Sequence, residues 1–310
     1  MLLKSKDILG LQGMDADEIN LILDSAATMK QLLIQNAKKM PHLQGKSIVA
    51  LFYENSTRTR LSFELAAKYL GATVSNLGVS SSSVNKGETL LDTGKTIEAM
   101  ETDLVVIRHP MSGAPKFLAD NFKGSVINAG DGTHEHPTQA LLDMFTMKER
   151  FGRLSGLNVS IIGDISHSRV ARSNLWGLKA LGANVTLCGM NTMMPPEIEK
   201  TGARITSSIE QAVRDADVIM ALRIQKERLE GAFLPSVREY HNYFGLNEQA
   251  LKACKKDVLI MHPGPINRGV ELSSDVADAD NSAITTQVTN GVAVRMALLY
   301  LLTRRKDDDN

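Results

Sequence analysis

A cluster of hydroxyl and guanidinium side chains follows an apolar segment early in the chain. Residues 47–53 (Ser-Ile-Val-Ala-Leu-Phe-Tyr) are typical of a buried strand, and residues 56–60 (Ser-Thr-Arg-Thr-Arg) follow closely. A helix that begins near Ser56 would offer unpaired backbone N–H groups and a partial positive charge, which together bind anions. The hydroxyls and arginines add donors of the type that hold a phosphate. The simpler alternative is that Ser56 only caps the helix and that the arginines lie in solvent.

Two later strand ends carry the same kind of chemistry. Arg108 comes at the end of the apolar segment 104–108, and residues 130–139 (Gly-Asp-Gly-Thr-His-Glu-His-Pro-Thr-Gln) follow the segment 125–128. In an open α/β sheet such strand ends meet at one edge, so we expect the three segments to converge on a crevice. A single strand end with a cationic side chain often occurs by chance. Three strand ends that bring Arg, His and Gln to the same edge favour a binding site.

Helical and strand-like segments alternate along nearly the whole chain. This alternation predicts an α/β fold of two domains, each a mainly parallel sheet flanked by helices. Strands are expected at residues 47–53, 73–77, 104–108, 125–128, 157–163, 185–188, 218–222 and 258–261. Helices are expected after Asp15, after Ser56 and at residues 90–100, 114–121, 137–151 and 288–304. The expected domains are 1–145 and 146–287, with a C-terminal helix in 288–310 that returns to the first domain.

Composition excludes several classes of protein. The 310 residues contain 35 basic and 35 acidic side chains, so the net charge favours neither a nucleic acid nor an anionic membrane as partner. Cys188 and Cys254 are too few for a disulfide framework and lack the spacing of a metal site, which favours a reducing, cytoplasmic compartment. No apolar stretch reaches the roughly 18 residues of a membrane span, and the N-terminus lacks the apolar core of a secretory signal.

Three of these segments resemble the signature of the aspartate/ornithine carbamoyltransferase family, and the similarity spans nearly the whole chain. They are Ser56-Thr57-Arg58-Thr59-Arg60, Arg108-His109-Pro110 and His136-Pro137-Thr138-Gln139. Three more segments resemble the aspartate branch of the family: 84–89 (Val-Asn-Lys-Gly-Glu-Thr), 223–228 (Arg-Ile-Gln-Lys-Glu-Arg) and 262–265 (His-Pro-Gly-Pro). The ornithine branch typically carries a cysteine-containing His-Cys-Leu-Pro segment, which this chain lacks.

The resemblance implies an enzyme that transfers the carbamoyl group of carbamoyl phosphate to the amino group of L-aspartate. The products would be N-carbamoyl-L-aspartate and phosphate, in an early step of de novo pyrimidine synthesis. The phosphate of the donor would be held by Ser56, Thr57, Arg58, Thr59 and Arg108. Thr59, Arg108 and His136 would surround the carbamoyl oxygen, where charge develops in the transition state. Gln139 and the backbone at Pro263 and Gly264 would hold the carbamoyl nitrogen.

For the acceptor, the resemblance implies that Arg169 and Arg223 bind the two carboxylates of aspartate with help from Gln225. The alternative for Arg169 is a surface arginine near a helix start. Val170 departs from those relatives that have a threonine at this position, which removes one hydroxyl contact with aspartate.

A serine-rich segment that contains Ser82 and Lys86 is assigned to the same acceptor site. In the family this segment reaches the active site of a neighbouring subunit, so the resemblance implies a homotrimer with shared active sites. Lys86 would contact both substrates. The catalytic residues would be Arg58, Thr59, Lys86, Arg108 and His136. Positioning and charge stabilisation would perform the chemistry, without a cofactor, a metal or a nucleophilic side chain.

Three other functions stay open at this point. A dinucleotide-binding dehydrogenase would suit the strand at 157–163, but the G-x-G-x-x-G fingerprint and the acidic residue after the next strand are missing. A carbamoyltransferase for ornithine or another amine would need an acidic or cysteine-bearing pocket rather than two arginines. A catalytically silent subunit would bind carbamoyl phosphate without releasing phosphate. A regulatory chain or another pathway enzyme as a partner is also left open.

Overall fold

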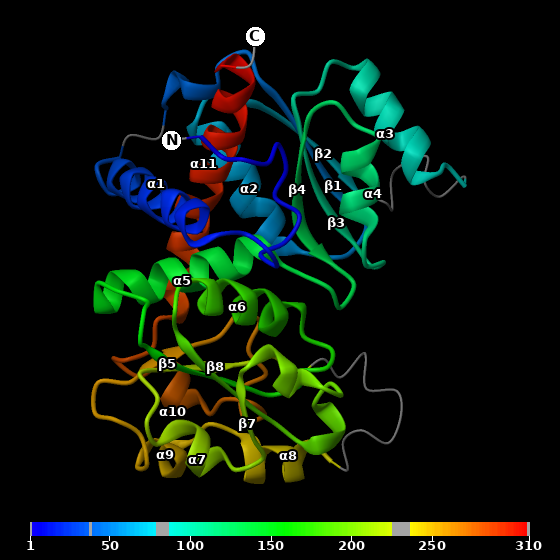
Figure 1. The fold of residues 1–310 in the computed structure, drawn as a ribbon. Coiled ribbons are helices and arrows are strands. Elements are labelled where there is room, and N and C mark those ends of the chain that lie inside the picture. The colour runs from blue at the N-terminus through cyan, green and yellow to red at the C-terminus, as the bar shows by residue number, and fades with distance from the viewer. Residues whose placement is uncertain (1, 37–38, 79–86, 225–235, 309–310) are drawn as a thin grey trace. The chain divides into compact units, whose positions relative to one another are not determined.

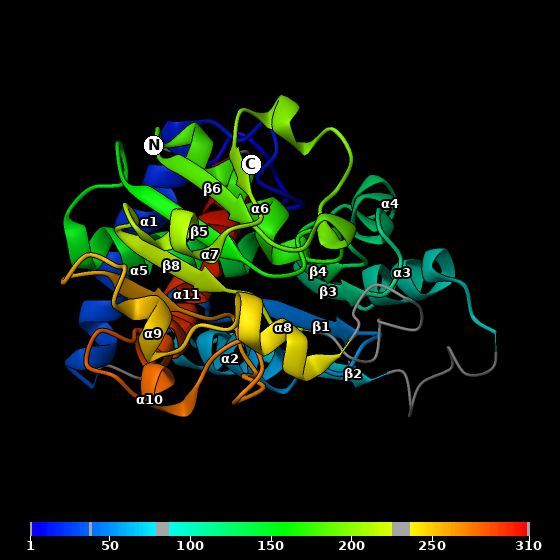
Figure 2. The same ribbon diagram turned by 90° about the horizontal axis from the view of Figure 1, so that it is seen from below.

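The computed structural model describes residues 2–36, 39–78, 87–224 and 236–308 of the chain. The chain forms two compact units (Figures 1 and 2), the first made of Met1–Phe145 with Thr289–Asn310 and the second of Thr146–Val288. Each unit contains one parallel β-sheet with helices packed against it. The two-domain α/β fold predicted from the sequence is therefore confirmed. Which substrate each domain binds remains a prediction.

The sheet of the first unit has the strand order β2-β1-β3-β4, and all its strand pairs are parallel. Its strands are β1 (Ser47–Phe52), β2 (Thr73–Gly78), β3 (Leu104–His109) and β4 (Ser125–Asp131). In β3 the adjacent residues Val106 and Ile107 point to opposite faces, and each is 0 % exposed. The central strands are continuous apolar runs because both faces of the sheet are covered.

Helices supply that cover. The helices that lie wholly or partly in the first unit are α1 (Ala16–Ile34), α2 (Thr57–Tyr69), α3 (Leu90–Ala99), α4 (Ala114–Asp120), α5 (Pro137–Phe151) and α11 (Ile284–Asp308), and a short 3₁₀ helix spans Pro41–Leu43. Figure 1 shows α3 and α4 on one face of the sheet and α1, α2 and α11 on the other. Ile97 of α3 and Leu118 of α4 join the strand residues Val105 and Ile107 in the core of the first face.

Local signals in the sequence set the ends of these helices. Asp15 caps α1 as predicted, since its carboxylate accepts a hydrogen bond from the N–H of Glu18 at 2.8 Å. α5 begins at Pro137, which has no N–H to leave unsatisfied in the first turn. Gly152, with φ 70°, follows the last residue of α5 in the left-handed conformation that ends many helices. The predicted helix at 137–151 is therefore confirmed at both ends.

The second unit has a sheet of five parallel strands in the order β7-β6-β5-β8-β9. The strands are β5 (Asn158–Ile162), β6 (Asn184–Cys188), β7 (Arg204–Thr206), β8 (Val218–Ala221) and β9 (Leu259–Met261). The helices are α6 (Arg169–Ala180), α7 (Ile209–Val213), α8 (Val237–Phe244), α9 (Glu248–Leu251) and α10 (Ser274–Ala277), with 3₁₀ helices at Asn191–Met193 and Ile198–Thr201. α6 lies on one face of this sheet, and α7, α8 and α9 lie on the other (Figures 1 and 2).

Two features differ from the prediction. β7 was not expected, because a three-residue edge strand whose residues are exposed or half-buried is too short to show a periodic pattern. α11 begins at Ile284, one turn before the expected start at residue 288. Within the described ranges, no helix combines the length and the apolar character needed to cross a bilayer.

Candidate active site

The carboxyl ends of β1, β3 and β4 lie side by side in the first unit. In the parallel register Phe52 pairs with Arg108, and His109 pairs with Asp131. The N–H of Tyr53, the first residue after β1, donates to the carbonyl of Arg108 at 2.8 Å. β2 lies on one side of β1 and β3 on the other, so this edge is a topological switch point, where α/β sheets bind their ligands. The expected convergence of the three strand ends is therefore present.

The first turn of α2 is suited to bind an anion. Ser56 occupies the N-cap position, but its side chain makes no capping hydrogen bond to the helix. The first turn contains no acidic residue that would offset the partial positive charge of the helix end. Thr57 and Arg58 are exposed, whereas Thr59 is 8 % exposed. The alternative in which Ser56 serves only as a cap is not supported, because its hydroxyl does not cap the helix.

Arg108 is held at two points between neighbouring segments. Its Nε donates to Glu54 Oε2 at 3.0 Å, and its Nη1 donates to the carbonyl of Ala129 in β4 at 3.3 Å. The side chains of Arg108 and Glu54 are only 16 % and 17 % exposed. A guanidinium that is already ordered in this way loses little further rotamer freedom when it binds a ligand. Arg108 is therefore a fixed cation at the end of β3.

His109, the next residue, adds no second charge here. Burial lowers the pKa of its imidazole. Its Nδ1 accepts a hydrogen bond from the N–H of Met111 at 3.0 Å, which requires a ring nitrogen without a proton. The ring also contacts Tyr53, with the two ring centroids 4.5 Å apart. His109 therefore acts as a neutral ring that packs the start of the loop after β3.

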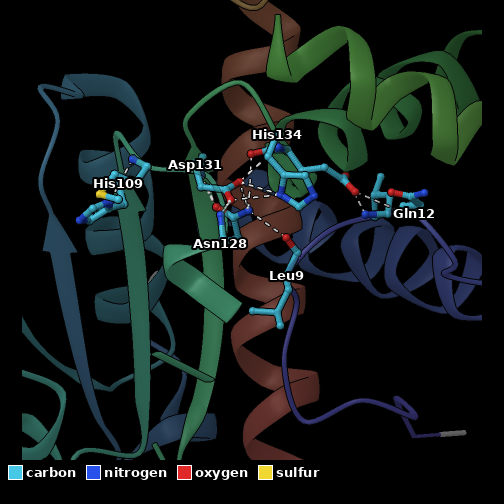
Figure 3. A network of polar contacts seen from close by, with 11 residues as sticks. Leu9, Gln12, His109, Asn128, Asp131 and His134 are labelled. Carbon is cyan, nitrogen blue, oxygen red and sulfur yellow. Dashed lines mark hydrogen bonds and ion pairs between the residues drawn. The ribbon is translucent and has the colours of Figure 1, made fainter. Parts of the chain in front are cut away.

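Asp131, the last residue of β4, ties the loops after β3 and β4 together (Figure 3). Its carboxylate belongs to a residue that is 1 % exposed, and it accepts hydrogen bonds from Gly113 N (2.7 Å), Asn128 Nδ2 (2.8 Å) and Glu135 N (3.1 Å). His134 Nδ1 lies 3.1 Å from the same carboxylate. These contacts fix the loop that leads into α5, because a buried carboxylate with several donors has one favourable arrangement.

Gly132 allows the two loops to approach each other. Its φ of 45° lies in the left-handed region, and a Cβ at this position would meet Ser112 Oγ at 2.4 Å and Ser112 N at 2.8 Å. Its N–H donates to the carbonyl of His109 at 3.0 Å. Any side chain here would therefore push the loop after β4 away from the loop after β3.

The carboxylate of Glu135 holds the N-terminal segment against this loop. Glu135 is 1 % exposed, and it accepts hydrogen bonds from Leu11 N at 2.8 Å and Gln12 N at 3.1 Å. Gly10 leaves room for it, since a Cβ there would lie 2.4 Å from Glu135 Oε1. Sequence reasoning missed the roles of Asp131 and Glu135, because no local pattern marks an acidic residue in a polar loop as buried.

We expect Glu135→Gln to destabilise the protein by roughly 1.5–3 kcal/mol, because an amide offers one accepting oxygen and turns an N–H toward the second donor. Amide hydrogen exchange should become faster at Leu11 and Gln12, which exchange mass spectrometry of the N-terminal peptide would measure. Glu199→Gln, a change at an exposed position of the second unit, is the control. Unchanged protection of the N-terminal peptide in Glu135→Gln would contradict this role of the carboxylate.

His136 and Gln139 come from the junction of this loop with α5. His136 is 5 % exposed and immediately precedes the first residue of the helix. Gln139 is 8 % exposed, and its Nε2 donates to Asp143 Oδ1 at 2.9 Å. Both residues belong to the first unit, like Arg108 and the start of α2. The fixed loop therefore delivers an imidazole and an amide to the edge of the sheet that carries the arginines.

A second switch point lies between β5 and β8 of the other unit, and Arg169 follows β5 as the first residue of α6. The N-cap residue Ser168 accepts a hydrogen bond from Ala171 N at 3.1 Å. Arg169 is only 5 % exposed, so the alternative of a surface arginine is wrong. A buried cation at the N-terminal end of a helix opposes the helix dipole, and such a costly placement favours a role in binding.

Arg223 and the turn at 263–264 follow the neighbouring strands β8 and β9, and Glu271 links them. Glu271 is 1 % exposed; it accepts a hydrogen bond from Asn267 N and lies 3.2 Å from His262 Nε2. Two further hydrogen bonds complete the link, from Asn267 Nδ2 to the Ile224 carbonyl (2.9 Å) and from Gly264 N to His262 Nδ1 (2.8 Å). The two strand ends are thus held in one arrangement.

Neither cysteine is a candidate nucleophile. Burial raises the pKa of the Cys188 thiol to about 12 and that of Cys254 to about 11, so both stay protonated at neutral pH. Across the described part of the chain, no group of three or more His, Cys, Asp or Glu side chains is arranged to hold a metal ion.

The structure places the predicted site residues in two groups. The first unit brings together Ser56, Thr57, Arg58, Thr59, Arg108, His136 and Gln139 at its switch point. The second unit carries Arg169, Arg223, Pro263 and Gly264 at the strand ends of its own sheet. Ser82, Lys86 and Gln225 lie outside the described residues.

Two parallel sheets with arginines, hydroxyls and a histidine at their switch points define a class of two-domain enzymes that bind small anionic substrates. Residues 6–149 match the family model "Aspartate/ornithine carbamoyltransferase, carbamoyl-P binding domain", and residues 155–302 match "Aspartate/ornithine carbamoyltransferase, Asp/Orn binding domain". The chain belongs to the aspartate/ornithine carbamoyltransferase family.

Individual relatives agree with this assignment. The chain is 63 % identical over 310 residues to the aspartate carbamoyltransferase catalytic subunit of Acetivibrio thermocellus, covering 100 % of this chain and 99 % of the relative. A crystal structure of aspartate transcarbamoylase from Trypanosoma cruzi in complex with carbamoyl phosphate and aspartate is similar with a TM-score of 0.87 and 31 % identity, covering 96 % and 97 % of the two chains. Ornithine carbamoyltransferase from Pyrococcus furiosus is similar with a TM-score of 0.86 and 30 % identity, covering 97 % and 98 %.

Proposed function

We propose that the chain is an aspartate carbamoyltransferase, which transfers the carbamoyl group of carbamoyl phosphate to the amino group of L-aspartate. One observation supports this function above the others: the acid-free first turn of α2 lies at the switch point beside the anchored Arg108. A doubly charged phosphate suits that position, since N–H groups, hydroxyls and guanidinium groups all donate toward it. The similarity to aspartate carbamoyltransferases along the full chain agrees with it.

The described residues suit the transfer step. The neutral amine of aspartate attacks the carbonyl carbon, a C–N bond forms, the C–O bond to phosphate breaks, and the leaving phosphate takes the proton that nitrogen loses. Negative charge grows on the carbonyl oxygen before phosphate leaves. Thr59, Arg108 and His136 would stabilise that charge, because donors that are already ordered need no rearrangement during the reaction. The step requires no covalent intermediate with the protein.

The acceptor is assigned by charge. Arg169 and Arg223 follow β5 and β8, which are neighbours in the second sheet, and two guanidinium groups suit the two carboxylates of aspartate. The cationic side chain of ornithine would be repelled there. The proposal includes Gln225, Ser82 and Lys86 in this site on the strength of the family resemblance. It also includes a cytoplasmic homotrimer in which Lys86 acts in the neighbouring subunit.

Turnover with two acceptors tests the proposal. We expect the purified chain to release phosphate from carbamoyl phosphate with aspartate at a kcat/KM at least about 10³-fold higher than with ornithine, because the ammonium group of ornithine would be repelled where aspartate places its second carboxylate. Mass spectrometry should identify N-carbamoyl-aspartate, and light scattering should give the mass of a trimer. Preference for ornithine would overturn the acceptor, and binding of carbamoyl phosphate without phosphate release would indicate a silent subunit.

A further inference from the structure

A buried carboxylate lies one helical turn beyond Gln139 on α5. Asp143 is 0 % exposed, and its Oδ1 accepts the hydrogen bond from Gln139 Nε2 at 2.9 Å. Residues four positions apart lie on the same face of a helix, so the contact is built into the helix itself. The amide of Gln139 therefore has a permanent partner within the first unit.

This partner fixes which way the amide faces. An ionised carboxylate can only accept hydrogen bonds, so the NH₂ end of the Gln139 amide must face Asp143. The oxygen, Oε1, is then the end that can accept a hydrogen bond from a ligand. The reversed amide would place two oxygens against each other, which costs free energy in a buried setting.

The negative charge of Asp143 acts on Arg295 of α11. Arg295 is 3 % exposed, and its guanidinium lies over the ring of Phe63, 5.1 Å from the ring centroid. Burial lowers the pKa of Arg295 to about 9, while the negative charge of Asp143 raises it. A buried cation and a buried anion stabilise each other, because either charge alone would remain uncompensated.

We propose that Asp143 is a positioning residue that makes the site selective for a carbamoyl donor over other acyl phosphates. By turning Oε1 of Gln139 toward the donor, it would supply an acceptor for the NH₂ of a carbamoyl group. The methyl of an acetyl group offers no such hydrogen and would leave that oxygen without its bond. This inference rests on the proposed function and adds the basis of donor selectivity to it.

Acetyl phosphate is the probe, because it differs from carbamoyl phosphate only by CH₃ in place of NH₂. Its acetyl carbon would be attacked by the same aspartate amine, with formation of a C–N bond and release of phosphate. The ratio of kcat/KM for the two donors then measures how strongly the site recognises the NH₂ group. An overall loss of structure would lower both values together and leave their ratio unchanged.

Asp143→Asn is the direct test, since it keeps the shape of the side chain but adds an NH₂ that can donate to a reversed Gln139. We expect the ratio of carbamoyl to acetyl phosphate to fall about 10- to 100-fold, mainly through kcat/KM for carbamoyl phosphate. Gln139→Leu should lower the ratio by a similar factor. The double variant that carries both Asp143→Asn and Gln139→Leu should have the same ratio as Gln139→Leu alone. Asp120→Asn, at an exposed carboxylate of the same unit, is the matched control.

Three outcomes would overturn the role of Asp143. They are an equal loss with both donors in Asp143→Asn, an unchanged ratio in Gln139→Leu, or a further fall when the two changes are combined. If Asp143→Asn does not fold, Gln139→Leu still decides whether the amide recognises the NH₂ group. A wild-type chain that forms no N-carbamoyl-aspartate would overturn the proposed function itself. That result does not depend on any of the variants.

Discussion

Arg58→Ala should lower kcat for phosphate release from carbamoyl phosphate and aspartate by about 10²–10³-fold, because Arg58 is predicted to hold the phosphate, which gains negative charge as its C–O bond breaks. Arg58 lies in the first turn of α2, where no acidic side chain offsets the helix charge. The alanine variant keeps the helix N–H groups and the neighbouring hydroxyls, so binding of phosphate should weaken without being abolished. Calorimetric titration with inorganic phosphate measures this weakening of phosphate binding separately from the loss of turnover.

Arg60→Ala is the matched control for this prediction. Both arginines are exposed on the same helix, but two positions separate them by about 200° around its axis. Arg60 faces a different environment, near Glu64 one turn further along: the hydrogen bond from Lys68 is the main cause that lowers the pKa of Glu64, and the charge of Arg60 adds a smaller effect. We expect Arg60→Ala to change kcat by less than about threefold, as for other surface substitutions. Equal losses in the two variants would mean that general positive charge, rather than a placed donor, supports the reaction.

The strand ends of the first unit could be predicted because their signals are local. A continuous apolar run predicts each strand, Pro137 marks the start of α5, and parallel strands must end at one edge of the sheet. These rules place the start of α2, Arg108 and His136 together without any knowledge of the tertiary structure. The family resemblance then assigns them their roles, which the geometry alone does not.

The residues that hold this edge in place could not be predicted in the same way. Glu135 is buried because its carboxylate receives the N–H groups of Leu11 and Gln12, more than 120 positions earlier in the chain. Asp143 is matched in charge by Arg295, which arrives on the last helix. Such pairs are long-range, and a single sequence shows only an acidic residue in a loop or on a helix. The residues that support the site are thus determined by tertiary packing and not by a local sequence motif.

Arg169→Ala should raise KM for aspartate about 10²-fold or more, because a buried arginine that pairs with a ligand carboxylate contributes strongly to affinity. KM for carbamoyl phosphate should change by less than about threefold, since the predicted phosphate donors are on α2 and β3. Arg169→Lys keeps the charge but loses the planar, two-point geometry, so its KM should lie between those of wild type and alanine.

The control for Arg169 is Arg214→Ala, which removes an exposed arginine paired with Glu210 in the same unit. It should leave both KM values unchanged. Steady-state kinetics with each substrate varied in turn separates the two constants, and inhibition by succinate, a dicarboxylate without the amine, reports binding without turnover. If Arg169→Ala raised KM for both substrates equally, Arg169 would support the structure of the second unit rather than bind the acceptor. A selective loss of aspartate and succinate binding requires that its guanidinium contact the carboxylates, since a general loss of structure has no preference between substrates.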